Sequence, residues 1–268
     1  MTASDSASGP RRRAVVTGAS SGIGAGFAEG LARQQYDLVL VARRRERLAE
    51  MAKRLRGRRE IEVEIAALDL TDPADLARLA ESIEATVPDL LVNNAGVGTF
   101  GAFAGLDPAR EMAQIQLNAA APVRLMLAAL PGMIARGHGS IINVSSLAGF
   151  QPMPFNATYG ATKAFLLSFS EALHEELRGT GVRVQVLCPG FTRTEFQEQA
   201  GIDASGVPGF AWMGVDAVVE ASLQALERGE LVCIPGSANR LLAAVQRAAP
   251  HALTRRLARE LMSRTIGD

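Results

Sequence analysis

Short apolar runs alternate along the chain with longer stretches in which apolar residues recur at helical spacing. Runs of this kind, ended by glycine or polar residues, are typical of strands buried in a parallel sheet, and the stretches between them are typical of connecting helices. Seven runs fit this description: AVVTG (14–18), DLVLVA (37–42), VEIAALDL (63–70), LLVNNAG (90–96), SIINVSS (140–146), VRVQVLCPG (182–190) and LVCIPG (231–236). The alternation predicts an α/β fold built on a doubly wound parallel sheet of about seven strands with helices on both faces.

The pattern changes towards the two ends of the chain. Residues 1–13 are small and polar apart from three closing arginines, and we expect them to be disordered. Residues 14–238 are expected to form a single domain, with a substrate flap at about 191–214 that is rich in glycine and aromatic residues. Residues 239–268 are predicted to extend this domain as an amphipathic helical tail.

The tail carries its apolar residues on a rough helical stripe, with arginines opposite. We expect this stripe to cover the core or a neighbouring subunit, and weak peripheral contact of residues 239–264 with a membrane surface is the alternative. The stripe consists of Leu241, Leu242, Val245, Leu253, Leu257 and Leu261.

Composition narrows the class of protein. Lys and Arg total 28 against 28 Asp and Glu, so no net charge favours binding to nucleic acid. Cys188 and Cys233 lie in apolar runs without metal-ligand spacing, and the three histidines show no mutual spacing of a ligand set, so we expect no metal. Because no apolar run approaches the roughly 18 residues of a membrane span, we expect a cytoplasmic protein.

Tyr159 and Lys163 lie four residues apart in NATYGATKAF, and both types are scarce, with two tyrosines and two lysines in the chain. On a helix this spacing brings an ammonium near a phenol. A neighbouring cation lowers the pKa of a phenol from its ordinary value of about 10, which would make Tyr159 a usable proton donor and acceptor. Taken alone, the same spacing is common on the surface of ordinary helices, so the pair needs support from other motifs.

The stretch TGASSGIG (17–24) follows the first predicted strand and opens a helix. Gly18, Gly22 and Gly24 would let the backbone turn tightly and approach a pyrophosphate at the helix N-terminus. The spacing is GxxxGxG and not GxGxxG, since Phe27 stands where a third glycine would fall when the count starts at Gly22. The motif indicates a dinucleotide site, and glycines kept for packing are the alternative.

Three arginines, Arg43, Arg44 and Arg45, follow the second predicted strand. NAD enzymes with this kind of sheet carry an acidic residue there for the ribose hydroxyls, whereas an arginine would pair with the 2′-phosphate of NADP. We therefore expect NADP(H) to be preferred over NAD(H). The alternative is a solvated start to a charged helix.

These motifs together resemble those of the classical short-chain dehydrogenase/reductase (SDR) family, in its NADP-preferring type, over about residues 14–236. TGASSGIG is similar to the family's TGxxxGxG turn, and NNAG (93–96) to the motif that supports its cofactor-binding sheet. Ser146 lies thirteen residues before Tyr159, which favours it over the adjacent Ser145. Further matching positions are Asp69 and Leu70 after the third predicted strand, Asn118 in QLNAAAP, and Pro189 and Gly190.

The resemblance implies a Rossmann-like fold and a catalytic set of Asn118, Ser146, Tyr159 and Lys163. Tyr159 would protonate the carbonyl oxygen as nicotinamide delivers a hydride, and Ser146 would hold that oxygen. Lys163 would bind the nicotinamide ribose and lower the pKa of Tyr159, while Asn118 would hold a water that links Lys163 to solvent. The cofactor contacts implied are Gly18, Ser20, Ser21, Gly22, Ile23, Gly24, Arg43, Arg44, Asp69, Leu70, Asn94, Ala95, Gly96, Tyr159, Lys163, Pro189, Gly190, Thr192 and Thr194.

Large apolar residues in the flap and after the fifth predicted strand indicate a hydrophobic ketone, aldehyde or alcohol as substrate, and the overall pattern resembles acyl-chain (3-oxoacyl) and steroid carbonyl reductases. The whole set consists of Phe150, Met153, Phe155, Phe191, Phe196, Phe210, Trp212 and Met213. For about half of these residues, packing in the core is the alternative.

The resemblance also implies a homodimer or homotetramer, formed through the helices after the fourth and fifth predicted strands, including FLLSFSEALHEEL (165–177).

Two other functions compete with the reductase. An NADP-binding redox sensor or scaffold without turnover would not need the complete catalytic set. The extended epimerase or dehydratase branch prefers a TGxxGxxG turn and a longer C-terminal substrate domain, and the sequence shows neither.

Overall fold

A computed structural model of the 268-residue chain describes residues 11–57, 60–201 and 207–248. Most of the predicted N-terminal segment lies outside these ranges, as do Leu253, Leu257 and Leu261 of the predicted stripe. The side chain of Phe210 is also outside the described part.

Seven strands form one sheet in the order β3-β2-β1-β4-β5-β6-β7, and every neighbouring pair is parallel. This confirms the predicted doubly wound sheet. The polar ends of several predicted runs leave the sheet, so that the strands are shorter than the runs. The strands are β1 (Arg13–Thr17), β2 (Asp37–Ala42), β3 (Val63–Ala67), β4 (Leu90–Asn93), β5 (Gly139–Val144), β6 (Val182–Leu187) and β7 (Val232–Cys233).

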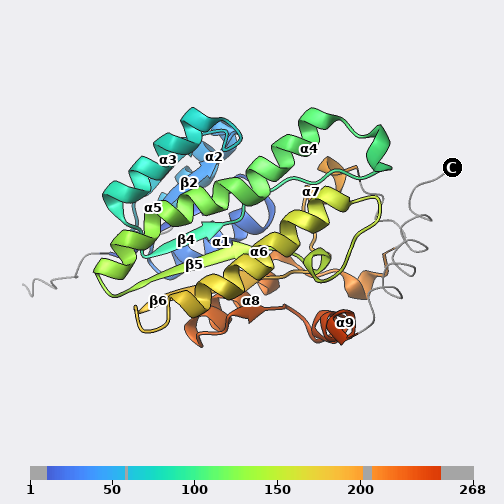
Figure 1. The fold of residues 1–268 in the computed structure, drawn as a ribbon. Coiled ribbons are helices and arrows are strands. Elements are labelled where there is room, and N and C mark those ends of the chain that lie inside the picture. The colour runs from blue at the N-terminus through green and yellow to red at the C-terminus, as the bar shows by residue number, and fades with distance from the viewer. Residues whose placement is uncertain (1–10, 58–59, 202–206, 249–268) are drawn as a thin grey trace, which may run out of the picture.

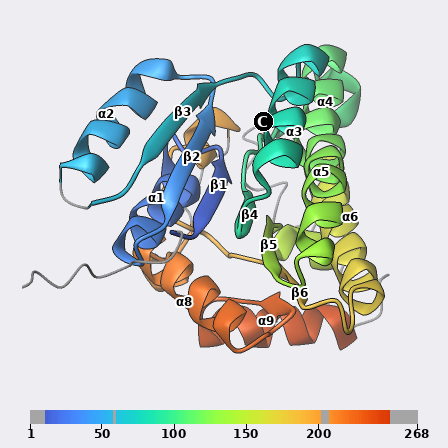
Figure 2. The same cartoon turned by 90° about the vertical axis from the view of Figure 1, so that its left-hand side faces the viewer.

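Helices cover both faces of the sheet (Figure 2). Helices α1, α2 and α8 pack on one face, and α3, α5 and α6 on the other. The helices are α1 (Gly22–Arg33), α2 (Arg45–Arg56), α3 (Pro73–Thr86), α4 (Pro108–Ile115), α5 (Ala121–Ala135), α6 (Ala157–Glu176), α7 (Phe196–Gln199), α8 (Val215–Glu227) and α9 (Ser237–Ala248). Shorter helical turns are η1 (Phe103–Gly105), the π-helical η2 (Gln116–Ala120), η3 (Leu147–Phe150) and η4 (Gly209–Ala211).

Side chains of β1 alternate between the two halves of the core, as the period of a strand requires. Ala14 and Val16 belong to the cluster under α1 and α8, whereas Val15 belongs to the cluster under α3 and α5. All three are almost fully buried. The apolar runs are therefore continuous because both faces of these strands are covered.

Strand order reverses beside β1, which lies between β2 and β4. In open α/β sheets such a reversal creates a crevice at the carboxyl ends of the strands, where ligands bind. The glycine-rich turn after β1, the arginines after β2 and the asparagines at the end of β4 all meet at this edge of the sheet. The fold thus brings together motifs that lie far apart in sequence.

Residues 108–135 form one long helical stretch made of α4, η2 and α5, which runs beside α6 (Figure 1). It is long and apolar enough to cross a membrane by length and composition alone, with a mean hydropathy of 1.4 in its most apolar window. In the fold, however, α5 packs against α3 and the sheet through buried residues such as Leu125, Met126 and Met133. The stretch is therefore accounted for as a core helix.

The described part of the tail differs from the prediction. Leu241, Leu242 and Val245 of the predicted stripe are 68%, 48% and 54% exposed on α9, so the expectation that they cover this chain's own core is wrong. The helix instead packs through the small Ala243 against Phe150 and Cys188. A small residue lets the helix backbone approach closely, which a pattern of large apolar residues does not reveal.

Candidate functional site

The turn between β1 and α1 needs glycine at the predicted positions. Gly18 and Gly22 have φ values of +66° and +56°, in the left-handed region that glycine adopts without strain. A Cβ atom on Gly18 would lie 2.7 Å from Nδ2 of Asn94, and one on Gly24 would collide with the carbonyl oxygen of Gly18. The turn is therefore a bare backbone cradle at the N-terminus of α1, a shape suited to a pyrophosphate.

Asn94 and Ala95 support this cradle from β4. The backbone amides of Asn94 and Ala95 both donate to Oγ1 of Thr17, at 2.9 Å and 3.0 Å. The Asn94 side chain donates to the carbonyl oxygen of Thr17 at 2.9 Å. Thr17 is thus the centre of the network, and sequence analysis missed it although it directly precedes Gly18 in the TG pair.

The arginines after β2 have different surroundings. Arg44 donates from Nε and Nη2 to Oγ of Ser20 at 3.3 Å and 3.1 Å, and from Nη2 to Oγ of Ser21 at 2.8 Å. Arg43 is well exposed and lies 3.8 Å from the carboxylate of Asp69. Arg45 is exposed at the start of α2. Of the three, Arg44 is the one held over the glycine-rich turn.

Asp69 and Leu70 follow β3 beside Arg43. Oδ1 of Asp69 accepts from the backbone amide and the hydroxyl of Thr71, at 3.0 Å and 2.8 Å. Leu70 is buried in the core cluster of α3 and α5. The carboxylate is thereby fixed at the sheet edge, next to the arginines.

Ser146, just after β5, lies close to Tyr159 on α6, as predicted, and its hydroxyl acts to lower the pKa of the phenol. Burial acts in the opposite direction and outweighs it, so that the pKa of Tyr159 is raised to about 12. The expected lowering of this pKa by Lys163 is therefore not found. At neutral pH the phenol carries its proton.

Lys163 lies on the same side of α6, and its Nζ is 5.5 Å from the centre of the Tyr159 ring. It is 5% exposed and donates to the carbonyl oxygen of Val144 at 2.8 Å. Burial lowers the pKa of Lys163 to about 8. The ammonium is bonded to this backbone carbonyl at the end of β5, and Lys163 is not among the groups that shift the pKa of Tyr159.

Asn118 lies in the π-helical turn η2 and is fully buried. Its Oδ1 accepts from the backbone amide of Val97 at 3.0 Å, and its Nδ2 donates to the Val97 carbonyl at 2.9 Å and to Oγ1 of Thr162 at 3.2 Å. A Cβ atom on Gly96 would lie 3.2 Å from Oδ1 of Asn118 and 3.5 Å from Nζ of Lys163. Gly96 therefore separates the two side chains and leaves the space between them open.

The segment after β6 carries the remaining predicted residues. Pro189 accepts a hydrogen bond from the amide of Leu147 at 3.0 Å, and a Cβ on Gly190 would overlap the side chain of Asn239. Thr192 is buried and pairs with Met213, which joins the two ends of the flap. The methyl group of Thr194 lies 3.1 Å from the place of a Cβ on Gly22, so this segment reaches the glycine-rich turn.

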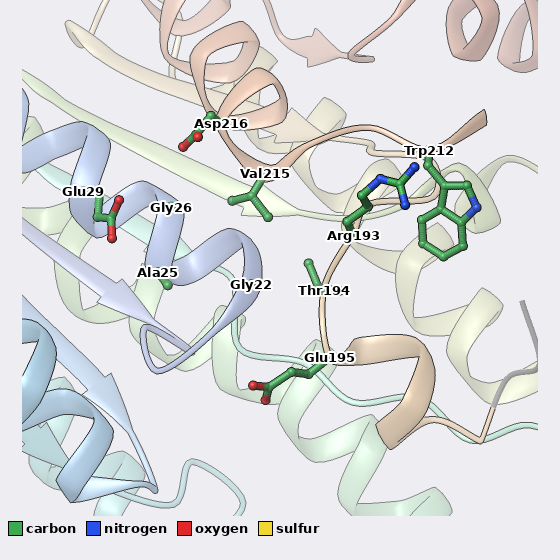
Figure 3. Close-up of a pocket in the computed structure, with 10 residues that line it drawn as sticks. All are labelled: Gly22, Ala25, Gly26, Glu29, Arg193, Thr194, Glu195, Trp212, Val215 and Asp216. Atoms are coloured by element: carbon green, nitrogen blue, oxygen red, sulfur yellow. The ribbon is translucent and has the colours of Figure 1, made fainter. Parts of the chain in front are cut away.

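A hollow of about 650 Å³ lies beside the contact between Thr194 and the glycine-rich turn (Figure 3). It is lined on one side by α1, from Gly22 to Glu29, and on the other by Arg193, Trp212 and Asp216. None of Ser146, Tyr159 and Lys163 lines it. The hollow therefore belongs to the surface behind the flap and is not the place where a carbonyl group would meet Tyr159.

Only some of the predicted apolar residues lie near Tyr159. The ring centre of Phe196 is 5.3 Å from that of Tyr159, and the Met153 side chain lies 3.1 Å from the place of a Cβ on the adjacent Gly160. Phe150 is buried in a core cluster instead, and Phe191 packs on Trp212 at 5.4 Å. The alternative of core packing is thus correct for Phe150.

Two charged residues that sequence analysis did not single out contact the site. Glu195 accepts from Nη1 of Arg44 at 3.0 Å and from Nη1 of Arg47 at 2.6 Å and 2.9 Å. The two arginines are close in sequence, but Glu195 is about 150 residues away, so no local pattern joins them. The charge run after β2 offered the only signal, and it did not identify a partner.

Comparison with known proteins agrees with this geometry. A family model for short chain dehydrogenases matches residues 12–204. The bovine very-long-chain 3-oxoacyl-CoA reductase is 34% identical over 68% of this chain and 60% of its own length. A short-chain dehydrogenase from Sphingobium yanoikuyae, solved in complex with NADPH, is 39% identical with a TM-score of 0.81, and covers 94% of this chain and 95% of its own.

A second solved structure, the bulky-bulky ketone specific alcohol dehydrogenase from Comamonas testosteroni, is 35% identical with a TM-score of 0.77, and the match covers 94% of each chain. The chain therefore belongs to the short-chain dehydrogenase family. It is an oxidoreductase that acts on CH–OH or C=O groups with a nicotinamide cofactor.

Proposed function

We propose that the chain is an NADP(H)-dependent carbonyl reductase for a hydrophobic ketone or aldehyde, with Tyr159 as general acid in reduction and general base in oxidation. The observation that carries this proposal is the meeting of Tyr159 with Ser146 beside the buried Lys163, at the edge of the sheet that holds the glycine cradle. A redox sensor without turnover would have no use for a proton donor held in this way.

With its pKa raised to about 12, Tyr159 keeps its proton at neutral pH and can still donate it to a developing alkoxide, which is the stronger base. Ser146 would hold the same oxygen, since its hydroxyl lies close to the phenol. The bound nicotinamide supplies the hydride. The two residues fix the oxygen that receives the proton, which leaves the carbonyl carbon to face the cofactor.

Lys163 would bind the ribose hydroxyls of the cofactor and return a proton to Tyr159. The open space left by Gly96 between Asn118 and Lys163 supports a water there. Because the side-chain amide of Asn118 is already bonded to Val97 and Thr162, we propose that it positions this water mainly by shaping the helix turn. Single-turn π-helices of this kind are frequent at functional sites.

The residues present fit a dinucleotide phosphate. A Cβ atom on Gly18, Gly22 or Gly24 would fill the space that the phosphates need. Arg44 lies next to this turn and donates hydrogen bonds to Ser20 and Ser21. We propose that Arg44 binds the 2′-phosphate of NADP(H), and that Arg43 and Asp69 flank the adenosine. The related dehydrogenase solved with NADPH supports the same preference.

The substrate is proposed to be bulky and apolar, in the manner of a 3-oxoacyl chain or a steroid. Phe196, whose ring packs on Tyr159, and Met153, which lies against Gly160, support an apolar approach to the reacting carbon. Two relatives, a 3-oxoacyl-CoA reductase and a bulky-bulky ketone specific alcohol dehydrogenase, point in the same direction. We further propose that the protein acts in the cytoplasm as a homodimer or homotetramer.

The proposal is tested by following NADPH and NADH oxidation with long-chain 3-oxoacyl thioesters, steroid ketones, bulky aromatic ketones and aldehydes. We expect turnover with NADPH on at least one of these classes. In Tyr159→Phe the rate should fall about 10²- to 10⁴-fold, since general acid–base catalysis contributes that much. Tight NADPH binding without turnover on any class would instead favour the sensor.

The cofactor preference has its own test. Arg44→Ala should reduce the NADPH/NADH ratio of kcat/KM by about 10- to 100-fold, because charge-assisted hydrogen bonds contribute about 1.5–3 kcal/mol. Arg45→Ala removes the same charge from an exposed neighbour and should leave the ratio within about twofold of the wild type. An equal fall of the NADPH/NADH ratio in both variants would show that the cofactor preference depends only on the total positive charge in this region.

A further inference from the structure

An ion-pair cluster joins α2 to the segment after β6. Glu195 accepts from Arg44 at 3.0 Å and from Arg47 at 2.6 Å, and Gln199 donates to the same carboxylate at 3.2 Å. The two arginines hold the pKa of Glu195 below its ordinary value. The carboxylate is therefore an anion at any pH at which the protein would work.

In Figure 3 the Glu195 carboxylate points away from Arg193 and Trp212. It lies against the guanidinium of Arg44, whose other nitrogens are bonded to Ser20 and Ser21. A 2′-phosphate on Arg44 would bring two further negative charges to this place. A phosphate and the Glu195 carboxylate therefore compete for one set of donors.

The residues on both sides of Glu195 contact the rest of the site. Thr194 lies against Gly22 of the glycine-rich turn, and Phe196 packs on the ring of Tyr159 at 5.3 Å. The tip of the Phe196 ring also lies 2.9 Å from the place of a Cβ on Gly98. Three consecutive residues thus span the site from the arginine cluster to the tyrosine.

We propose that Glu195 is an internal substitute for the cofactor's 2′-phosphate, which holds the segment closed until NADP(H) displaces it from Arg44 and Arg47. Displacement moves Glu195 away from the arginines and withdraws Phe196 from Tyr159, which opens the place for the carbonyl substrate. NAD(H) lacks the 2′-phosphate and leaves the ion pairs intact. This inference rests on the proposed NADP(H) preference and adds to it a residue that couples cofactor identity to substrate access.

The cluster is loose enough to be displaced. Side chains of Arg44, Glu195 and Arg47 are 37%, 41% and 46% exposed, so each pair is screened by water and weakly held. A phosphate with two charges and three acceptor oxygens can replace a single carboxylate on two arginines. Removal of the carboxylate should therefore strengthen binding of a 2′-phosphate by about fivefold.

The experiment compares 2′,5′-ADP with 5′-AMP, which differs from it only by lacking the 2′-phosphate, by calorimetry on the full chain. Wild type should bind 2′,5′-ADP more tightly than 5′-AMP. Glu195→Gln should strengthen binding of 2′,5′-ADP about fivefold and leave binding of 5′-AMP within about twofold. Glu198→Gln, which removes an exposed charge from the same short helix, is the matched control and should change neither. If Glu195→Gln and Glu198→Gln behave alike, general charge accounts for the effect and the proposal is wrong.

Trp212, the one tryptophan of the chain, reports on the flap because its ring packs on Phe191. We expect 2′,5′-ADP, but not 5′-AMP, to change its fluorescence in wild type, and Glu195→Gln without ligand to move towards the liganded signal. Equal wild-type affinity for the two ligands would contradict the NADP(H) preference itself, and the inference with it. A clear wild-type preference for 2′,5′-ADP with no gain in Glu195→Gln would contradict the inference alone.

Discussion

Lys163 is a buried cation, and its described environment offers it a backbone carbonyl rather than a carboxylate. Burial costs the charged form free energy, which is the reason why its pKa falls to about 8. The unfolded chain keeps the ordinary value of 10.5. A residue placed in this way lowers the stability of the fold, and such a cost is typical of residues retained for function.

The pH dependence of stability tests this account. Between about pH 8 and 10.5 the unfolded chain holds the proton on Lys163 and the folded chain does not, so the free energy of unfolding rises with pH across this window. Lys163→Met lacks this contribution. Its stability relative to wild type should therefore fall by about 2–3 kcal/mol between pH 7 and pH 10. Urea unfolding of both proteins at the two pH values measures it, and a pH-independent difference would contradict the burial of a charged Lys163.

The glycines of the turn allow a second prediction. Gly24→Ala places a methyl group against the Gly18 carbonyl and the Asn94 side chain, so the turn must move. We expect a loss of about 1–3 kcal/mol in stability and at least about tenfold weaker NADPH binding. Gly214→Ala is the control, because a Cβ there meets no atom within 4 Å. Unchanged NADPH affinity in Gly24→Ala would show that the turn does not hold the cofactor.

At the scale of elements, α4, α5 and α6 each leave a large apolar side chain exposed in the single chain. Ile115, Leu127 and Phe165 are all more than 40% exposed, and Phe165 stacks on Phe169 at 5.6 Å. Exposed large side chains on neighbouring helices favour association of identical chains. This supports the proposal that the protein assembles through the helices after β4 and β5.

Negative charge introduced at these exposed apolar positions should therefore separate the subunits. Leu127→Glu combined with Phe165→Glu should lower the mass measured by size-exclusion chromatography with light scattering to that of one chain. Leu241→Glu on α9 is the comparison variant, since Leu241 is equally exposed on another face. Dissociation by Leu241→Glu alone would assign the interface to the tail instead.

The sequence predicted the elements of this fold well where both sides of an element are buried, because periodicity then reflects packing directly. It failed on α9, since Leu241, Leu242 and Val245 point outward while Ala243 makes the core contact. It also could not predict the π-helical turn at Asn118, which depends on the hydrogen bonds of that side chain to Val97.

At the scale of the whole molecule, the candidate site was predicted wherever a short motif carries the chemistry, as for Ser146, Tyr159 and the glycine turn. The contacts that cross the fold were not predictable. Glu195 meets Arg44 only because the segment after β6 returns over the end of β2, and Lys163 turns to Val144 only because β5 ends beside α6. Long-range electrostatics depends on tertiary distances that no motif contains.

Direct hydride transfer under the control of Tyr159 is the central claim, and it is tested by NADPH that carries deuterium at both C4 positions of the nicotinamide. With a bulky ketone that the enzyme reduces, we expect one deuterium per product at the carbinol carbon. Tyr159→Phe should bind NADPH with wild-type affinity and form deuterated product about 10²- to 10⁴-fold more slowly. Product without deuterium, or an undiminished rate in Tyr159→Phe, would contradict the account.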